Sequence, residues 1–210
     1  VIGEGVTGFT TAKVTSQHGM VYSELVDSFD KDTARLYGKA NETAIQTIED
    51  IITNERIDCG WRREDNYVYT QKPDEVEKLK HEAKLAKSLG LPAKFVTTTP
   101  LPFSVEAAVQ FKNQGVFHVL RYMQGLAACI EGGGSFVFEH TKAFAFKDGA
   151  PAYFKTAKAK VTANEVVFAT NAPAALKDHV YYGLLEYPVR SYIVAGKVEA
   201  PKLNNGMYIN

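Results

Sequence analysis

The sequence has no excess of positive or negative charge and no long apolar run, and each of these absences argues against a class of protein. Its 210 residues include 24 Lys and Arg against 24 Asp and Glu, so nothing favours a nucleic acid or an anionic membrane as a partner. No apolar run approaches the ~20 residues of a membrane span, and no charged-then-apolar signal peptide opens the chain. With 45% hydrophobic and 23% charged residues, the composition is that of a globular protein, which we expect in the cytoplasm.

Cysteine is scarce as well. Cys59 and Cys129 stand far apart and match neither a zinc nor an iron–sulfur pattern, so we expect two buried thiols in a reducing compartment. A disulfide between them is the alternative. The sequence also has no Ser-His-Asp signature, no P-loop and no His/Glu cluster with metal-ligand spacing. Nucleophilic hydrolysis, phosphate-loop chemistry and a protein-bound metal are therefore not indicated.

What the sequence does have is a polar opening segment, Gly3–Gly19, that is rich in Gly and Thr. Glycine lets the backbone approach a ligand closely or adopt positive φ angles. Lys13 and His18 add a cation and a titratable imidazole. Hydroxyl groups come from Thr7, Thr10, Thr11, Thr15 and Ser16. Such a segment cannot form core, so we predict a loop that lies around a polar and bulky ligand.

Within this segment Gly3, Gly5 and Gly8 spell G-x-G-x-x-G. The dinucleotide-binding fingerprint needs a β-strand in front of this motif and an apolar helix behind it. Only two residues precede it here, and the residues that follow lack helical periodicity. We therefore interpret the match as accidental.

Apolar periodicity along the rest of the chain predicts alternating helices and strands, a mixed α/β (α+β) class. The longest helix should begin at Asp30 or Asp32, either of which can cap it, and end near Asn54. The other helices are expected over 20–29, 73–90 and 119–130. Strands are expected over 58–63, 66–71, 93–98, 105–111, 135–139, 142–147, 152–156, 158–162 and 166–170. The last of these is an apolar run typical of a strand buried in a parallel sheet.

The stretch G-V-T-G-F-T-T-A-K-V-T-S-Q-H-G, at Gly5–Gly19, resembles an FAD-contacting loop of the D-amino-acid oxidase/glycine oxidase (DAO) superfamily. It is most similar to a bacterial branch of FAD-dependent oxidoreductases, some members of which carry a C-terminal Rieske domain. The resemblance extends over nearly the whole chain. Its other well-matched stretches are Phe117–Tyr122, Glu139–Thr141, Ala169–Pro173 and Tyr187–Val194.

The resemblance implies part of an FAD-binding domain of the glutathione-reductase-like type and part of a substrate-domain β-sheet. The FAD-contacting loop and helices would occupy 1–60, and substrate-domain strands with a helix 61–112. Segment 113–175 would supply the FAD-domain helix, strands and β-meander, and 176–210 would return to the substrate-domain sheet. The amino-terminal strand, glycine turn and helix of that domain are not in the sequence, and neither is its last FAD-contacting segment. We therefore expect an internal fragment of a longer protein, in which a Rieske domain could follow.

The resemblance also implies roles for individual residues. Arg190, on a Y-P-V-R-S-Y strand with Tyr192, would hold a substrate carboxylate through its planar fork of donors, and His18 would lie near the flavin ring. From the residues alone, a surface arginine on an edge strand is an equal alternative for Arg190. The residues expected to contact FAD are Gly5, Val6, Thr7, Gly8, Thr10, Thr11, Lys13, Thr141, Lys142, Ala143, Ala169, Thr170 and Asn171.

The implied reaction is hydride removal from a carbon of a small-molecule amine or amino acid to FAD, chemistry that belongs largely to the cofactor. Because the helix that binds the pyrophosphate is missing, we expect the isolated chain to bind FAD weakly or not at all and to be inactive. Two alternatives stay open. One is a non-enzymatic α+β binding or interaction module, and the other is a flavin enzyme that acts on modified RNA, against which the lack of a basic face argues.

Overall fold

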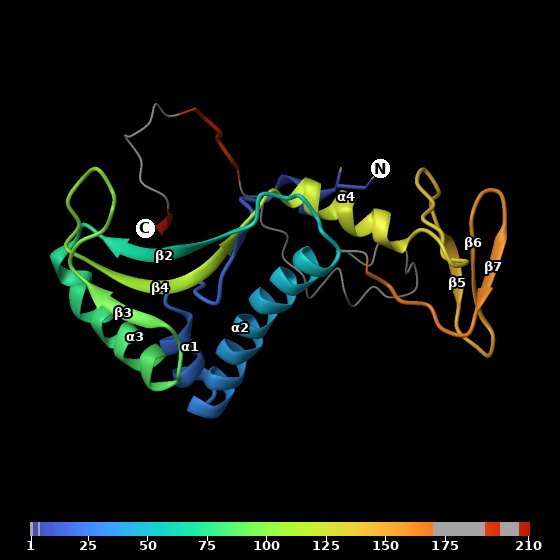
Figure 1. The fold of residues 1–210 in the computed structure, drawn as a ribbon. Helices are drawn as coiled ribbons and strands as arrows, with labels where there is room; N and C mark the ends of the chain where they lie inside the picture. Colours follow the sequence, from blue (N-terminus) through green and yellow to red (C-terminus); the bar gives the residue numbers. More distant parts are fainter. Residues whose placement is uncertain (1, 4, 170–191, 198–205) are drawn as a thin grey trace. The chain divides into compact units, whose positions relative to one another are not determined.

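A computed structural model of the chain describes residues 2–3, 5–169, 192–197 and 206–210 (Figure 1). These residues form two compact units. The larger unit comprises the described residues within 2–135 and 195–210, and the smaller one those within 136–194. The division of the chain into four segments that the family resemblance implies stays a prediction.

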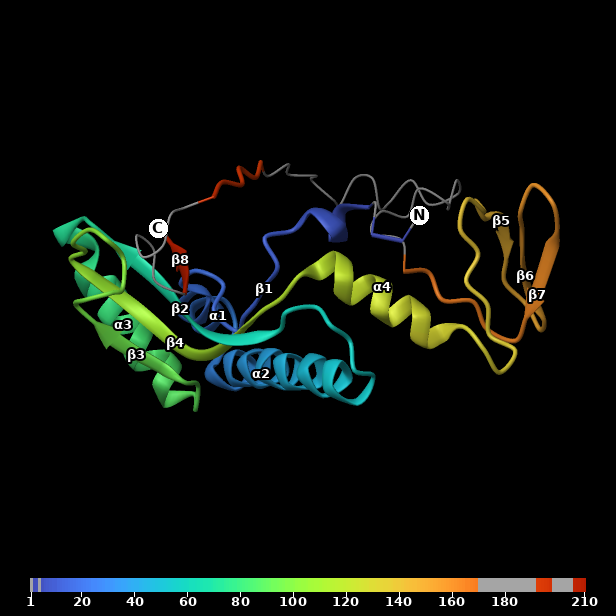
Figure 2. The same ribbon diagram turned by 45° about the horizontal axis from the view of Figure 1, so that its top comes forward.

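The larger unit is built on a five-stranded sheet with the order β1-β4-β2-β8, in which β3 also pairs with β4. Its central strand β4 is antiparallel to β1, β2 and β3, whereas β8 runs parallel to β2. Figure 2 shows β8 beside β2 at the edge of this sheet. The strands are β1 (Lys13–Val14), β2 (Arg62–Thr70), β3 (Ala93–Val96), β4 (Ala107–Val116) and β8 (Met207–Ile209).

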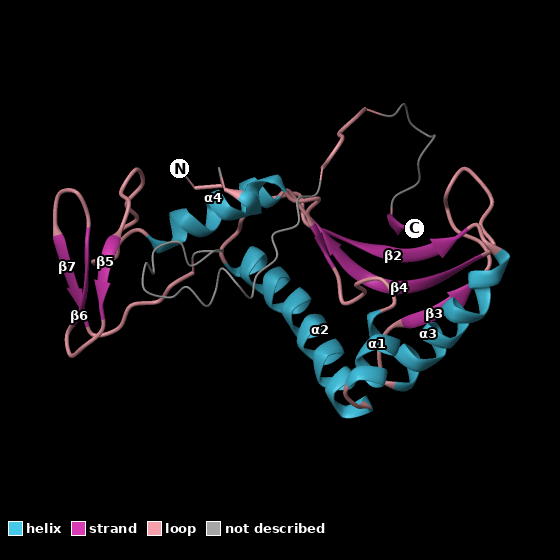
Figure 3. Ribbon diagram, turned by 180° about the vertical axis from the view of Figure 1, so that it is seen from behind, coloured by secondary structure: helices cyan, strands magenta, loops and turns pink. Residues whose placement is uncertain are grey.

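Three helices cover one side of this sheet, and a fourth helix follows β4 (Figures 1 and 3). The helices are α1 (Val21–Ser28), α2 (Lys31–Asn54), α3 (Val76–Ser88) and α4 (Val119–Ile130). All four confirm the helices expected from the sequence. The Asp30 carboxylate accepts a hydrogen bond from Thr33 N at 2.7 Å, which is the predicted cap of α2.

The main core lies between the sheet and these helices. Alternate residues of β4, Ala107, Val109 and Phe111, are fully buried and face α1 and α3. The ring of Tyr22 from α1 stacks on Phe111, with centroids 5.9 Å apart. Full burial of one such side chain contributes about 1.5–3 kcal/mol to folding. A second cluster, under α4, holds Ile52, Ile57, Cys59 and Tyr122.

The smaller unit contains a three-stranded antiparallel sheet with the order β5-β6-β7. The strands are β5 (Phe144–Lys147), β6 (Ala152–Lys155) and β7 (Lys160–Ala163). The hairpin expected around Asp148-Gly149 is confirmed, and so is the third strand. The exposed Lys160 ammonium lies 4.1 Å from the centroid of the Tyr153 ring.

Several expectations are wrong in detail. Residues 62–70 form one continuous strand rather than two, and β4 continues to Val116. No strand forms over 135–139, where Phe136 and Phe138 are more than 70% exposed, because nothing in the described part of the chain covers them. Residues 166–169 are not in a strand either, and Val167 is exposed. Both cysteines are free thiols, and Cys129 is exposed rather than buried.

A buried carboxylate holds the amino-terminal end of α1. Met20 occupies the cap position and has no side chain that can accept a hydrogen bond. Glu82 of α3, which is 1% exposed, replaces that cap from outside the helix. Its two oxygens each accept a backbone N–H at 2.9 Å, from Tyr22 and Ser23, and the Ser23 hydroxyl donates to it as well. Glu82 thereby ties α1 to α3.

We expect Glu82→Gln to lower the free energy of unfolding of the larger unit by about 1–3 kcal/mol, because an amide N–H₂ then faces a backbone donor in a buried place. Urea denaturation followed by far-ultraviolet circular dichroism measures this change, since the four α-helices lie in that unit. Glu77→Gln on the same helix is the control. Glu77 is exposed and, among the described residues, forms an ion pair with the exposed Lys80, so its loss should cost less than about 0.5 kcal/mol. Equal effects of the two variants would contradict the capping role.

Candidate functional site

The Gly/Thr-rich segment is a loop, as predicted. It makes one 3-10 turn over Val6–Phe9, closed by a hydrogen bond from Gly8 N to Gly5 O at 3.0 Å, and continues extended into β1. No α-helix follows the G-x-G-x-x-G motif, which agrees with its interpretation as accidental. Only glycine fits at position 8, because a Cβ atom on Gly8 would lie 1.7 Å from the carbonyl oxygen of Gly3.

The first half of the loop presents its polar groups outward. Thr7, Thr10 and Thr11 are exposed, and Gly8 is half-buried. Lys13 is half-buried at the start of β1, and this burial lowers the pKa of its ammonium group. Exposed hydroxyls, closely spaced glycines and a cation are groups that can lie along a phosphate-containing cofactor. The chemistry of these residues therefore fits the loop that the family resemblance implies.

The second half of the loop is fixed by buried amide groups. Ser16 N donates to Gln114 Oε1 of β4 at 2.7 Å. The Gln17 side chain donates to Val109 O at 3.0 Å and accepts from Asn66 Nδ2 at 2.7 Å. Gln114 Nε2 in turn donates to the Glu42 carboxylate of α2 at 3.1 Å. The loop is thus exposed where it would meet a ligand and anchored where it meets the sheet.

His18 follows the anchored residues directly. Its Nδ1 lies 2.5 Å from the Tyr37 hydroxyl of α2, and the two rings meet edge to face. The residue is exposed overall, but its ring is partly desolvated by its neighbours, which lowers the pKa of the imidazole against a smaller opposite effect of a hydrogen bond with the Thr15 backbone. The neutral ring therefore predominates at neutral pH, which is the form that can accept a proton.

The remaining expected site residues belong to the smaller unit or lie outside the described residues. Thr141, Lys142 and Ala143 precede β5; the first two are exposed, and the Thr141 hydroxyl donates to Glu139 O at 2.9 Å. Ala169 is exposed, and Tyr192 is 90% exposed. The residues outside the described part of the chain are Thr170, Asn171 and Arg190. The roles of all these residues stay predictions.

A second polar group lies on the sheet face opposite the helices and was not found from the sequence. We call it the tyrosine cluster: Asp65, Tyr67, Gln110 and Tyr208. Tyr67 of β2 and Tyr208 of β8 stack with centroids 5.4 Å apart and 12° between the rings. Gln110 Nε2 donates to Asp65 Oδ2 at 2.6 Å and to the Tyr67 hydroxyl at 3.1 Å. Burial, and then the Asp65 charge, raises the pKa of Tyr67, so its phenol stays protonated.

A β-bulge places Asp65 in this cluster. Glu64 pairs with Gln114 and Asn66 with Phe111, so two residues of β4 stand opposite the single residue Asp65. One of the two, Asn113, has a left-handed φ of 56°, and its N–H donates to Asp65 Oδ1 at 3.3 Å. Bulges of this kind re-aim side chains and are frequent next to active sites.

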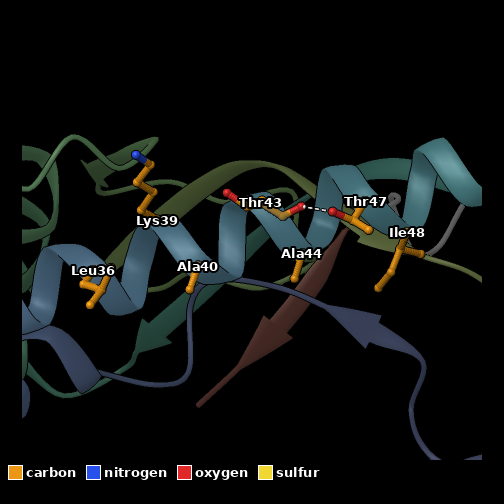
Figure 4. Close-up of a pocket in the computed structure, with 7 residues that line it drawn as sticks. All are labelled: Leu36, Lys39, Ala40, Thr43, Ala44, Thr47 and Ile48. Carbon is orange, nitrogen blue, oxygen red and sulfur yellow. Dashed lines mark hydrogen bonds between the residues drawn. The ribbon is translucent and has the colours of Figure 1, made fainter.

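An apolar hollow runs along one face of α2 (Figure 4). The only hydrogen bond drawn between its lining residues joins the Thr47 hydroxyl to Thr43 O at 2.9 Å, which satisfies the helix itself. The lining residues are Leu36, Lys39, Ala40, Thr43, Ala44, Thr47 and Ile48. Lys39 is the only titratable group among them, so the hollow offers no chemistry.

The described residues contain no group of three or more His, Cys, Asp or Glu side chains that could hold a metal ion. Among the helices in the described ranges, none is long and apolar enough to cross a membrane.

The chain shares its fold with solved structures of glycine oxidase and L-proline dehydrogenase. The structure superposes on glycine oxidase from Geobacillus kaustophilus with a TM-score of 0.65 at 16% identity, covering 86% of this chain and 49% of that one. L-proline dehydrogenase from P. horikoshii gives a TM-score of 0.59 at 17% identity, covering 80% and 44% of the two chains. At these identities the likeness shows the fold alone.

The sequence comparisons are more specific. The family described as FAD dependent oxidoreductase (DAO) matches residues 1–208. A Bacillus subtilis (strain 168) protein, YhfW, whose name describes a Rieske 2Fe-2S iron-sulfur protein, is 33% identical over 209 residues, which are 98% of this chain and 40% of that protein. The chain belongs to the DAO family of FAD-dependent oxidoreductases, whose cofactor is FAD. It spans half or less of the length of these relatives.

We expect the His18 imidazole to titrate below its ordinary pKa of about 6.5, because its partial burial disfavours the charged form. The Cε1–H resonance, followed by NMR against pH, measures the midpoint. Repeating the titration in urea is the control, since unfolding should return the midpoint to the ordinary value. Below about pH 6.5 the unfolded chain binds a proton at His18 more readily than the folded protein does. His18 therefore lowers the free energy of unfolding as the pH falls through this range. A native midpoint above the value in urea would contradict the assignment.

Proposed function

We propose that the chain is the part of a flavin-dependent oxidoreductase that lies along FAD and forms one wall of the substrate site. The reaction is removal of a hydride from a carbon of a small-molecule amine or amino acid. The observation that supports this most strongly is the family match over residues 1–208, together with a fold shared with glycine oxidase and L-proline dehydrogenase. When bound, FAD supplies the hydride acceptor.

The protein groups then have binding and orienting roles. Residues of the opening loop, exposed except for the half-buried Gly8 and Lys13, would hold the cofactor: Gly5, Val6, Thr7, Gly8, Thr10, Thr11 and Lys13. His18, neutral and hydrogen-bonded to Tyr37, would accept or relay a proton near the reacting atoms. Arg190 would bind a substrate carboxylate, with Tyr192 beside it. The name of the Bacillus subtilis relative supports a Rieske domain as an electron-transfer partner in the whole protein.

We further propose that the chain on its own retains FAD weakly and is inactive. Its expected cofactor contacts are divided between the larger unit and the smaller one. Its G-x-G-x-x-G stretch forms one 3-10 turn rather than opening an α-helix, so it lacks the helix terminus that usually binds a pyrophosphate.

The test compares the chain with the full-length natural protein. The full-length protein should copurify with a yellow flavin, and a panel of amines and amino acids should bleach that flavin without oxygen. The chain alone should show little visible flavin absorbance. A colourless full-length protein, or one whose flavin no amine reduces, would refute the function; a stoichiometric flavin in the chain would refute only the weak retention.

In the full-length protein, Gly8→Ala should reduce the flavin content at least several-fold. The added methyl group has no room beside Gly3 O, so the loop must change its path. Gly196→Ala is the matched control, because a Cβ atom there meets nothing within 4 Å. The ratio of flavin to protein absorbance measures both variants. Equal flavin content in the two would show that the loop path does not matter to the cofactor.

A further inference from the structure

We propose that the tyrosine cluster binds the cationic amino group of the substrate, with Asp65 as its counter-ion. This inference rests on the proposed function, since it assigns a place to the amine of that reaction. It was not evident from the sequence motifs, all of which lie elsewhere. Four observations on the described residues support it.

The first observation is an unpaired carboxylate. Asp65 is half-buried, and its two oxygens accept hydrogen bonds from the amides of Gln110 Nε2 and Asn113 N, with the Tyr67 hydroxyl as a further hydrogen-bonding neighbour. Both donors are neutral amides, and no Lys, Arg or His of the described residues forms an ion pair with Asp65. A carboxylate oxygen has further acceptor capacity beyond one hydrogen bond. No cation among the described residues therefore offsets the carboxylate of Asp65, and its oxygens can accept further donors.

The second observation is the aromatic surface beside this carboxylate. Tyr67 is 7% exposed, because the ring of Tyr208 lies over it, and Tyr208 itself is half-buried. The face of a tyrosine ring attracts a cation, and the attraction grows as water is excluded. A carboxylate next to stacked aromatic rings is a combination that suits an alkylammonium ion better than a neutral molecule or an anion.

The third observation is the sign of the charge around the cluster. The pKa of Tyr208 is raised first by burial, then by Tyr67, and then by the charges of Glu64 and Asp65. Both carboxylates therefore act on its hydroxyl. Glu64 is already paired with Arg62 at 3.0 Å. On the same sheet face, Lys94 stands opposite Gln110 in the register of β3 and β4 and is exposed. Glu64 thus has a cationic partner in Arg62, whereas the hydrogen bonds to Asp65 come from neutral groups.

The fourth observation is the geometry that holds Asp65. The carboxylate stands opposite the bulge of β4, and the amide of the bulged residue donates to it. Gln110 holds its other oxygen and the Tyr67 hydroxyl at once. A carboxylate fixed by two amides on a sheet loses little freedom when it binds a ligand, which favours affinity.

The probe is n-butylammonium, with n-butanol as its neutral counterpart, titrated into the 210-residue chain carrying ¹³C-labelled tyrosine rings. We expect saturable shifts of the Tyr67 and Tyr208 resonances with n-butylammonium and binding at least about tenfold weaker with n-butanol. Asp65→Asn should weaken n-butylammonium binding by about tenfold or more, because a charge-assisted hydrogen bond becomes a neutral one. Neither measurement needs FAD.

Two further variants make the result specific. Tyr208→Leu removes the aromatic face and keeps the charge, so it should weaken n-butylammonium binding several-fold and leave n-butanol unchanged. Asp50→Asn is the matched control: Asp50 is an exposed carboxylate of α2 that accepts from Gln46 Nε2 at 2.8 Å, and its loss should change nothing. The amide spectrum of each variant shows whether it is folded.

Equal binding of the two probes, or unchanged affinity in a folded Asp65→Asn variant, overturns the inference. Shifts confined to tyrosines outside the cluster overturn it as well. If the full-length protein oxidises amines but the cluster does not bind n-butylammonium, the inference fails and the proposed function stands. If the cluster binds n-butylammonium and no amine reduces the flavin, only the proposed function fails.

Discussion

The structure depends on the buried amide contacts that join the end of the opening loop to the sheet. Gln17 is 1% exposed and Gln114 fully buried, and each unmet hydrogen bond of such a group would cost about 1–3 kcal/mol. Their partners lie on β2, on β4 and, through Glu42, on α2. These contacts fix the end of the loop at the sheet, whereas most of its first half is exposed.

Much of the fold follows from local signals. Asp30 caps α2 as predicted, and Pro73, expected in the first turn of the next helix, begins the 3-10 turn directly before α3, because capping and proline geometry depend on a few neighbouring residues. The strand pairing of the sheet was harder to predict from the sequence. The alternation of β2 breaks at Asp65, which resembles a strand end in the sequence, but pairing with β4 continues on both sides. Phe136 and Phe138 alternate like a strand, yet a strand needs a partner, and the described part of the chain offers them none.

The candidate site also has one part that local sequence signals predict and one part that they do not. The loop was found because glycine and threonine reveal a ligand-facing backbone by composition alone. The tyrosine cluster was not, because its members come from β2, β4 and β8, and Tyr208 meets Tyr67 only through a parallel pairing of strands distant in sequence. The alternation of Tyr67 and Tyr69 with buried Asn66 and Val68 does indicate a common face, but no local pattern indicates what lies across it.

The bulge in β4 connects the two parts of the site. Gln110 and Gln114 are four residues apart, and in a regular strand their side chains would point to the same face. The extra residue changes this parity: Gln110 faces the tyrosine cluster, while Gln114 faces the helices and holds Ser16. One strand thus supports the proposed amine site on one side and the loop proposed to contact the cofactor on the other. Because one residue of register exchanges the two faces, both parts depend on the same irregularity.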